Sequence, residues 1–332
     1  MTTAATARPG GEAAFTELVA PHRAALLAHC YRMTGSLHDA EDALQDTMLR
    51  AWKAFDQFEG RSSLRTWLFT VATNACRRLL ERRARRVLPV DFGPPTDPHG
   101  DAAPPLLEST WVSPFPGADV DDSPAGRYES KESVELAFVA ALQWLPSRQR
   151  AVLLLRDVLA FSASETASAL DTTPASVNSA LQRAHKALEG RLPDRSQQAT
   201  LRSLGDDAAR QVVTRFVDAW DRHDVDALVA LLAADVELTM PPMPTWFRGV
   251  DAVEDFLRRF PLAETNRWRG VPVDANGQLA CALYRDTDGA WTAHSINVLA
   301  MRGGEIAGFH AHLDPTLFPA FGLPEVLEPA AG

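Results

Sequence analysis

Cysteine, long apolar runs and positive charge are all scarce in this sequence of 332 residues. Its three cysteines, Cys30, Cys76 and Cys281, lie far apart, so they predict neither a disulfide framework nor a metal-ligand pair. No segment approaches the roughly 20 apolar residues that cross a bilayer, and the N-terminus, MTTAATARPGGEAAF, lacks the apolar core of a secretion signal. We therefore expect a cytoplasmic protein with no membrane contact, no metal and no cofactor, whose cysteines are reduced and buried.

The net charge is −10, from 33 Lys and Arg against 43 Asp and Glu. An acidic total argues mildly against nucleic-acid binding, but the charge is unevenly distributed. A basic cluster consists of Arg77, Arg78, Arg82, Arg83, Arg85 and Arg86, and the acidic residues concentrate further along the chain. Hydrophobic residues make up 46% of the chain, which at this length is enough for two or three compact domains.

Residues 12–88 form the first predicted unit, which is helical. Apolar residues recur there at three- and four-residue spacing, with hardly any Pro or Gly inside the runs. One helix is predicted from Leu37 to Phe55, with three aspartates together on one face. After a break at Glu59–Ser63, a second helix is predicted from Leu64 to Arg86.

The composition changes after this unit. Residues 89–130 are rich in Pro and acidic residues, so we expect an extended linker that cannot build a core. Helical periodicity returns in residues 131–193. A short helix within Phe161–Leu170, a turn and a second helix at Pro174–Leu188 predict a helix-turn-helix, and Pro174 suits a first helical position.

Residues 206–327 form a third predicted unit, which follows a polar connector. Amphipathic helices precede strand-like runs that are joined by tight turns. The expected helices are Ala208–Asp221, Val225–Leu232 and Ala252–Phe260, and the expected strands are Val236–Met240, Gln278–Tyr284, Trp291–Met301 and Glu305–Leu313. Helices followed by a strand meander indicate an α+β domain. The predicted fold class is therefore multi-domain, with two all-α domains and a C-terminal α+β domain.

The segment Asp39–Trp52, DAEDALQDTMLRAW, is by itself an ordinary amphipathic helix with a solvated acidic face. Together with FEGRSSLRTWL at Phe58–Leu68 and ATNACRR at Ala72–Arg78, it resembles regions 2.2 to 2.4 of the extracytoplasmic-function (ECF) sigma factors of the sigma-70 family. The resemblance implies a helix that docks on the β′ clamp helices of core RNA polymerase. Its expected contacts are Asp39, Asp42, Gln45, Asp46, Leu49, Arg50 and Trp52.

In that family the following segment captures a base flipped out of the −10 element and holds the melted strand. Capture of a single strand needs cations, hydroxyl donors and flat surfaces. The residues that match this role are Arg61, Ser62, Ser63, Arg65, Asn74, Arg77 and Arg78. Trp67 lies in an apolar run, so we expect it to be a core residue rather than a stacking platform.

LPSRQRAVLLLRD at Leu145–Asp157, followed by the helix-turn-helix, resembles sigma region 4. The resemblance implies contact with the polymerase β flap and a recognition helix in the major groove of the −35 element of promoter DNA. The expected DNA contacts are Asn178, Ser179, Gln182, Arg183, His185 and Lys186. Many ECF members carry basic residues where this chain has Asn178 and Ala180, so −35 affinity should be modest and salt-sensitive.

The linker has two interpretations. The resemblance implies that it threads the active-site and RNA-exit channels of polymerase, where its negative charge would mimic nucleic acid. Composition alone is equally consistent with a solvated tether.

Asp207–Val236 and MPPMPTWFRG at Met240–Gly249 resemble the SnoaL-like branch of the NTF2-like fold. The combination matches the ECF subgroup with a SnoaL-like C-terminal domain, including the SigG-like group. The NTF2-like fold is a cone whose curved sheet can enclose a pocket for a small molecule. The expected wall residues are Met240, Trp246, Tyr284, Trp291, His294, His310 and His312. No motif fixes a base–acid pair, and two histidines are not a metal site without a third ligand.

Taken together, these observations predict a sigma factor that binds core RNA polymerase, directs promoter-specific initiation and is modulated by its C-terminal domain through a ligand or an intramolecular contact. We expect no enzymatic activity and no cofactor. The alternative is an NTF2-like ligand-sensing or enzymatic protein with an attached DNA-binding region.

Overall fold

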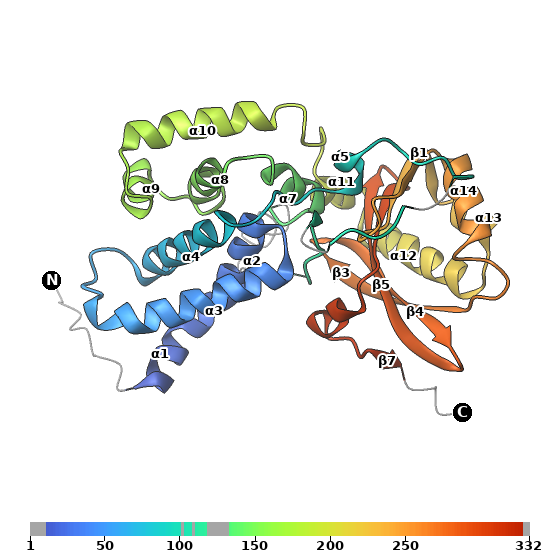
Figure 1. Cartoon of the computed structure of the whole chain (residues 1–332), viewed down its shortest axis with the longest axis horizontal. Helices are drawn as coiled ribbons and strands as arrows, with labels where there is room; N and C mark the ends of the chain where they lie inside the picture. The colour runs from blue at the N-terminus through green and yellow to red at the C-terminus, as the bar shows by residue number, and fades with distance from the viewer. Residues whose placement is uncertain (1–10, 101–102, 108–109, 118–132, 328–332) are drawn as a thin grey trace. The chain divides into compact units, whose positions relative to one another are not determined.

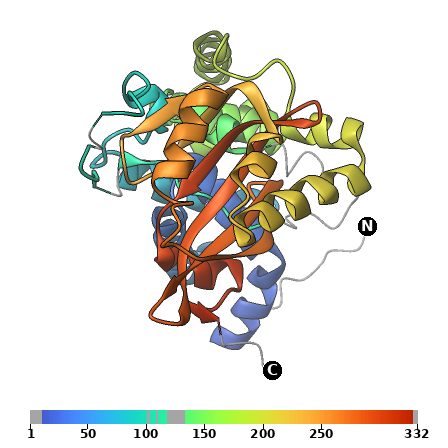
Figure 2. The ribbon, with the colours of Figure 1, turned by 90° about the vertical axis from the view of Figure 1, so that its right-hand side faces the viewer.

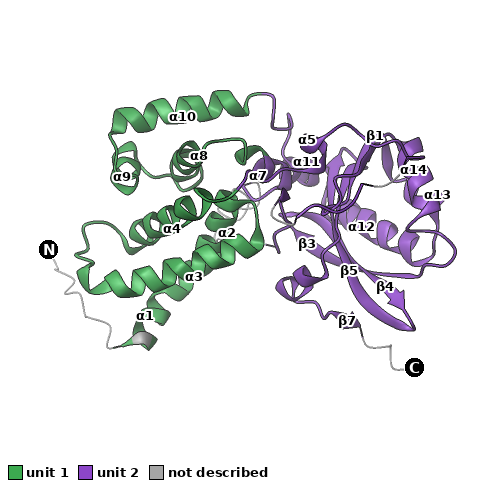
Figure 3. Ribbon diagram, in the orientation of Figure 1, with its two compact units in different colours: residues 1–83, 119–127, 141–189 green, residues 84–118, 128–140, 190–332 purple. Residues whose placement is uncertain are grey.

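The computed structural model describes residues 11–100, 103–107, 110–117 and 133–327 of the chain. The chain divides into two compact units, which are coloured separately in Figure 3. Unit 1 comprises residues 1–83, 119–127 and 141–189, and unit 2 comprises residues 84–118, 128–140 and 190–332. Within the described ranges, no helix is long and apolar enough to cross a membrane.

The described elements of unit 1 are all helical (Figure 1). In chain order they are α1 (Glu12–Val19), η1 (Ala20–His22), α2 (Arg23–Thr34), α3 (Leu37–Ala54), η2 (Phe55–Gln57), α4 (Leu64–Leu80), α8 (Ser147–Leu153), η4 (Leu154–Val158), α9 (Ala163–Ala169) and α10 (Pro174–Leu188). Helix α7 (Leu136–Leu142) begins in unit 2 and ends in unit 1.

Helices α2, α3 and α4 pack together around fully buried side chains that include Leu26, Tyr31 and Phe69. Local signals fix where two of these helices begin. The side chain of Ser36 accepts a hydrogen bond from the Asp39 backbone N–H at the start of α3, and Ser63 caps α4 in the same way. Such caps satisfy N–H groups that have no partner within the helix.

Helices α9 and α10 form the expected helix-turn-helix. A capping box between Ser162 and Glu165 begins α9. Pro174 occupies the start of α10, and the Thr173 side chain caps that helix. The observed bounds of α10 agree with the helix predicted from the sequence.

Unit 2 is built on a seven-stranded mixed sheet. The strands are β1 (Leu232–Thr239), β2 (Trp246–Arg248), β3 (Trp268–Ala275), β4 (Gln278–Thr287), β5 (Ala290–Arg302), β6 (Glu305–His312) and β7 (Val326–Leu327). Its order is β2-β1-β6-β5-β4-β3, with β7 paired to β5. Strands β1 and β6 are parallel, and the other pairs are antiparallel.

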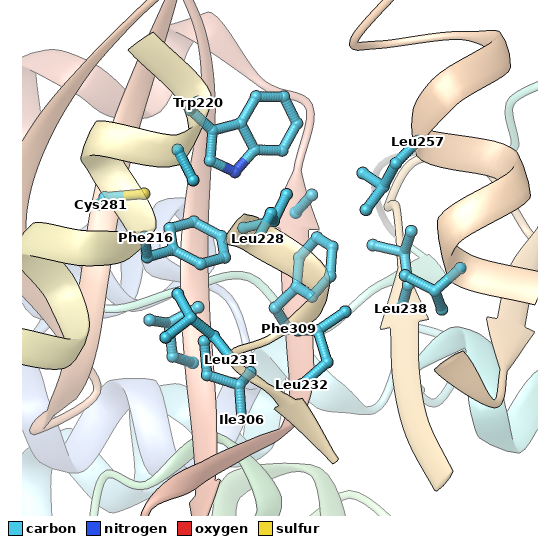
Figure 4. Packing of buried hydrophobic residues seen from close by; sticks show 14 of the residues in the cluster. Phe216, Trp220, Leu228, Leu231, Leu232, Leu238, Leu257, Cys281, Ile306 and Phe309 are labelled. Atoms are coloured by element: carbon cyan, nitrogen blue, oxygen red, sulfur yellow. The ribbon is translucent and has the colours of Figure 1, made fainter. Parts of the chain in front are cut away.

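The helices of unit 2 are α5 (Pro89–Phe92), α11 (Gln197–Leu204), α12 (Asp206–Asp221), α13 (Val225–Val229), α14 (Val250–Arg259) and η5 (Pro315–Phe321). Helices α12 to α14 lie on one side of the strands (Figure 2). The hydrophobic core lies between them and the sheet. In Figure 4, Phe216 and Trp220 of α12 lie on one side of this cluster, and Leu238 of β1 and Leu257 of α14 lie on the other.

Several elements differ from the sequence-based expectation: β2, η5 and β7 were not predicted, and three further differences follow. Helix α4 ends at Leu80, so the basic cluster lies mostly beyond it. The connector after residue 193 contains α11, which begins at a Ser196 cap. Strand β3 was not predicted because it contains Gly270 and Pro272; it is an edge strand, the position in a sheet that tolerates Pro.

The linker also differs from the expectation. Its described residues belong to unit 2, and Trp111, Val112 and Phe115 are buried there. The Phe115 backbone N–H donates to Asn276 Oδ1 at 3.0 Å, and the Gly117 N–H donates to the Asp274 carbonyl at 3.0 Å. The described linker is therefore part of a domain core rather than a solvated tether.

Candidate functional site

The exposed face of α3 carries most of the predicted polymerase contacts. Asp42, Gln45 and Arg50 are exposed, and they surround two apolar side chains, Leu49 (54% exposed) and Trp52 (42% exposed). Residues three and four apart share a helix face, which explains the grouping. Large exposed apolar groups ringed by charges are typical of a protein-binding surface.

The two remaining aspartates of α3 are engaged within unit 1. The Asp46 carboxylate accepts a hydrogen bond from Arg50 at 2.7 Å and lies 3.7 Å from the Arg78 guanidinium. Asp39 is 1% exposed and forms an ion pair with Arg83 at 3.1 Å. Asp39 therefore does not belong to the exposed face, and we correct the sequence-based expectation: the basic segment after α4 covers this carboxylate.

The residues predicted to hold the −10 strand lie at the start of α4 and along it. Arg61, Ser62, Ser63 and Arg65 are exposed. Ser63 is also the helix cap, so one lone pair of its hydroxyl is already used by the Thr66 N–H at 3.0 Å.

Trp67, which was expected to be a core residue, is half-buried. Its ring centroid lies 5.0 Å from that of Phe58 and 6.2 Å from that of Phe55. The three rings form an aromatic cluster beside the loop that precedes α4.

Two of the predicted −10 residues contact the helix-turn-helix segment. Asn74 Nδ2 donates to the Ala169 carbonyl at 3.2 Å, and the Arg65 guanidinium donates to the Leu159 carbonyl at 3.5 Å. Arg77 in turn donates to Asn74 Oδ1 at 3.3 Å. These hydrogen bonds occupy the side chains that were predicted to face DNA.

The buried side chain of Arg150 adds hydrogen bonds between the end of α2 and the segment that contains α8. Arg150, 5% exposed, donates through one guanidinium nitrogen to the Met33 carbonyl and to Gln143 Oε1, and through the other to the carbonyls of Gln143 and Leu145 at 3.1 Å each. Gln143 Nε2 donates to the Arg32 carbonyl at 3.3 Å. Helix α2 ends here, and the last carbonyls of a helix have no partner within the helix itself, so Arg150 and Gln143 supply donors to two of them, those of Met33 and Arg32. Burial lowers the pKa of Arg150 to about 10, so the side chain remains charged.

All six predicted −35 contacts lie on the exposed side of α10. Val177, Ala180, Ala184 and Leu188 form the opposite, buried side. One of the six is already engaged, because His185 Nε2 lies 2.6 Å from the Asp157 carboxylate. Asn178, Gln182 and Lys186 follow one another at four-residue spacing, as a helix in a groove requires.

Unit 2 contains a cavity of about 440 Å³ between its helices and its sheet. Of the predicted wall residues, Met240 and His294 line it. Strand alternation explains why most of the others do not. On β6, Phe309 and Ala311 face the cavity, so His310 and His312 face the other side of the sheet.

The same parity places Tyr284 away from the cavity, with its hydroxyl donating to the Pro324 carbonyl at 2.9 Å. Trp291 lies at the start of β5 and pairs with Leu327 of β7. Trp246 packs toward the linker, and its indole N–H donates to the Gly93 carbonyl at 2.9 Å. These three, with His310 and His312, are corrected as wall residues.

Residues that the sequence analysis missed complete the wall, among them Trp220, Trp268, Arg285 and Ser295. A β-bulge contributes to this surface. Leu283 pairs with Ser295 but Tyr284 pairs with Ala293, so His294 is the extra residue and lines the cavity together with Ser295. Bulges re-aim side chains in this way, and strand alternation in a sequence gives no sign of them.

The buried histidines of unit 2 are neutral near pH 7. His310 Nδ1 lies 2.9 Å from Thr239 Oγ1, and burial lowers its pKa to about 4. Burial lowers the pKa of His312 to about 3. Within the described ranges, no group of three or more His, Cys, Asp or Glu residues gathers in a geometry that could hold a metal ion.

A helical unit with an exposed docking face and a helix-turn-helix, joined to an α+β domain, is the construction of a sigma factor with an appended domain. The family models agree: Sigma-70 region 2 matches residues 18–86, Sigma-70 region 4 matches residues 135–188, and the SnoaL-like domain matches residues 213–309. These matches confirm the predicted combination of folds.

The chain is 44% identical over 325 residues to the ECF RNA polymerase sigma factor SigG of Mycobacterium tuberculosis, with 96% of this chain and 86% of the relative covered. It is 30% identical over 274 residues to SigJ of the same species, covering 81% of this chain and 78% of that protein. The crystal structure of SigJ covers 93% of this chain and 99% of its own, with a TM-score of 0.58 at 24% identity, and shares the fold.

The chain therefore belongs to the ECF RNA polymerase sigma factors. As a member of that family it binds core RNA polymerase and promoter DNA and directs promoter-specific initiation of transcription. This conclusion confirms the function predicted from the sequence motifs.

Proposed function

We propose that the C-terminal SnoaL-like domain controls this sigma factor by holding the linker between its two sigma regions. The sigma regions themselves supply three surfaces: α3 for polymerase, the start of α4 for the −10 element, and α10 for the −35 element. The whole chain acts as a regulator in the cytoplasm, without chemistry of its own.

Polymerase docking is assigned to the face of α3 that carries Asp42, Gln45, Asp46, Leu49, Arg50 and Trp52. Leu49 and Trp52 supply the apolar anchors, and the surrounding charges fix the register on the β′ clamp helices. Asp42→Lys and Asp46→Lys should each weaken binding to core polymerase by about tenfold or more while the fold is retained. Glu17→Lys, which makes the same charge change on exposed α1, is the matched control.

Promoter contact requires a rearrangement within unit 1. Asn74 and Arg65 bond to carbonyls of the helix-turn-helix segment, so they cannot hold the −10 strand until that segment moves away. Arg61, Ser62, Arg77 and Arg78 complete the −10 surface. The described arrangement is thus a closed state, and binding to polymerase supplies the free energy that opens it.

Promoter reading at −35 is assigned to the exposed side of α10, with Asn178, Gln182 and Arg183 toward base edges and Lys186 toward phosphate. Region 4 is also the part of the chain proposed to meet the polymerase β flap. His185 is tied to Asp157, so its contribution to phosphate binding is smaller than that of Lys186.

The linker contact carries the proposal for the C-terminal domain. The Leu106 N–H donates to the Pro242 carbonyl at 2.9 Å, Trp111 Nε1 donates to the same carbonyl at 3.1 Å, and the Thr96 N–H donates to the Trp246 carbonyl at 2.7 Å. A linker bound along this domain cannot also thread the channels of polymerase. Release of the linker is therefore a step on the way to the active holoenzyme.

The test is run-off transcription with core polymerase on a broad set of promoter fragments. Trp111→Phe combined with Trp246→Phe leaves an aromatic ring at each position but removes both indole N–H donors. Transcripts that depend on the protein should rise with the double variant. Equal output from the double variant and the unchanged chain would remove linker release from the mechanism.

A further inference from the structure

The cavity of unit 2 has the size and the lining of a small-molecule site. Its volume, about 440 Å³, lies in the range of pockets that enclose drug-sized ligands. Trp220, Trp268, Phe256 and Phe309 supply aromatic walls. Phe260, 49% exposed, lies at the rim.

Two buried polar atoms on the cavity-lining side chains lack a hydrogen-bond partner among the described residues. One is Nε1 of Trp220, a residue only 4% exposed, and the other is Nδ1 of His294. Figure 4 shows the indole nitrogen of Trp220 pointing into the interior of the cluster. Native cores rarely leave such atoms unsatisfied, and a bound ligand with an acceptor oxygen would supply the missing partner for the Trp220 N–H.

The charged residues that line the cavity are both cations. Arg259 and Arg285 line it and no Asp or Glu does, although Arg259 lies 3.2 Å from the carboxylate of Asp255, which is not a lining residue. Arg285 is exposed at the rim and has no ion-pair partner among the described residues. Burial and the positive charge of Arg285 lower the pKa of His294 to about 4, so this histidine adds no charge of its own at pH 7.

We propose that this cavity binds a hydrophobic monocarboxylate, with an aromatic or alicyclic body against Trp220, Trp268 and Phe309 and its carboxylate at Arg285. An apolar interior with an unpaired guanidinium at its rim suits an amphipathic anion. A neutral ligand of the same shape forfeits the charge-assisted hydrogen bond.

The cavity wall also holds the linker. Arg259 lines the cavity and donates to the Pro98 carbonyl of the linker at 2.8 Å. Met240 lines it too, and the Pro242 carbonyl two residues later accepts from the Leu106 N–H. A ligand whose carboxylate binds Arg285 occupies the cavity that Arg259 lines, and displacement of the Arg259 side chain by the bound ligand removes a donor from the linker. The conclusion that loss of this donor helps to release the linker and so to activate the sigma factor rests on the proposed function.

Fluorescence titration of the full chain tests the site, with pyrene-1-carboxylate and its neutral isostere pyrene-1-carboxamide as probes. The carboxylate should bind at least about tenfold more tightly than the amide, because a charge-assisted hydrogen bond to the Arg285 guanidinium is stronger than one to a neutral acceptor. Arg285→Gln should abolish this difference. Arg269→Gln, an exposed arginine on the neighbouring strand that does not line the cavity, should preserve it.

A second variant locates the probe. Ala311→Phe fills the cavity from β6 and should weaken both probes, provided circular dichroism shows a folded chain. Equal affinities for carboxylate and amide overturn the anion site. So does a preference that survives both Arg285→Gln and Ala311→Phe, or an absence of binding at millimolar probe.

The link to the linker has its own readout, which needs no polymerase. Hydrogen exchange at the Thr96 and Leu106 amides should accelerate severalfold when pyrene-1-carboxylate is bound, and not with Arg259→Gln, which lacks the guanidinium. Binding without a change in exchange would leave the ligand site standing and remove its coupling to the linker. If exchange changes but transcription does not, the proposed linker control fails instead.

Discussion

Each unit of this sigma factor holds a segment in place by polar contacts, and the two sets of contacts differ in their chemistry. In unit 1, the Arg150 guanidinium is buried and donates to backbone carbonyls of two segments. In unit 2, most hydrogen bonds to the linker come from neutral groups, among them Asn276 and the indole of Trp111, and fewer come from arginines, Arg86 to the Trp111 carbonyl and Arg259 to the Pro98 carbonyl. A neutral hydrogen bond contributes about 1 kcal/mol, whereas breaking a buried charged contact costs about 3–5 kcal/mol.

This difference predicts two kinds of release. Apart from the Arg86 contact, the linker can leave unit 2 in steps, one hydrogen bond at a time. The closed association within unit 1 is lost as a whole, because a half-broken contact leaves Arg150 buried without partners. A weak signal, such as a ligand, therefore acts on the linker, and a strong partner, such as polymerase, is needed to separate α4 from the helix-turn-helix.

The largest effect should come from Arg150→Met, which keeps the length of the side chain but removes its donors. The carbonyls of Met33, Gln143 and Leu145 then lose a buried charged donor, and the free energy of unfolding should fall by about 3 kcal/mol or more. Urea unfolding followed by circular dichroism measures this. Arg148→Met, on an exposed arginine of the same helix, should change stability by about 0.5 kcal/mol or less. Equal losses from the two variants would show that the buried guanidinium is not a special contact.

Acid should weaken both units, because each one buries a neutral histidine. His29 in unit 1 and His310 in unit 2 have pKa values lowered to about 3 and about 4, mainly by burial. Below pH 6.5 the unfolded chain binds protons that the folded chain does not, so stability falls as the pH decreases toward the folded pKa. For His310 the loss from pH 7 to pH 5 is about 2 kcal/mol.

Unfolding at the two pH values separates the histidines. His310→Asn keeps a polar atom for Thr239 and should reduce the pH dependence of stability, and His29→Asn should do the same through Thr73. An unchanged pH dependence in both variants would mean that other groups control the acid response. If only one variant responds, the two units differ in this property as well.

A smaller effect, of about 1–2 kcal/mol, is expected from Asn276→Gly. The side chain of Asn276 accepts from the Phe115 N–H and donates to the Val134 carbonyl at 2.7 Å. Its φ is 56°, a conformation that glycine adopts without strain, so the substitution removes the hydrogen bonds and leaves the turn intact. Amide exchange at Phe115 should rise by about tenfold. Protection equal to that of the unchanged chain would show that the linker is held by burial alone.

The sequence predicted helix faces better than it predicted strand faces. The exposed side of α10 and most of that of α3 follow directly from helical periodicity. Asp39 was misassigned because its partner, Arg83, is 44 residues away in the sequence and comes close to it only in the folded structure. A local pattern carries no information about such a contact.

The residues that line the cavity were harder to predict than the helix faces, for a different reason. Histidines and aromatic residues on β4 and β6 suggested a wall, but a side chain's choice of sheet face depends on register, and a shift of one residue reverses it. The bulge at His294 moves one residue into the wall that alternation alone does not predict. In the linker, acidic composition concealed three buried residues, Trp111, Val112 and Phe115, because averages over a segment hide its few anchors.

The smallest predicted effect isolates one contact of the unit 1 association. Gly35 and Gly60 have nearly the same φ, 71° and 70°, so an alanine at either position meets the same backbone strain of about 1–2 kcal/mol. They differ in their surroundings: a Cβ at Gly60 meets nothing within 4 Å, whereas one at Gly35 lies 2.9 Å from Gln143 Cδ. Gln143 cannot move without disturbing its hydrogen bonds to Arg150 and to the Arg32 carbonyl. Gly35→Ala should therefore destabilise the chain by about 1 kcal/mol more than Gly60→Ala in urea unfolding.

This excess destabilisation should disappear when each substitution is made in the Arg150→Met variant, because the contact that Gln143 supports is already lost there. An excess that persists there would place the strain in the end of α2 itself and not in the association of the two sigma regions.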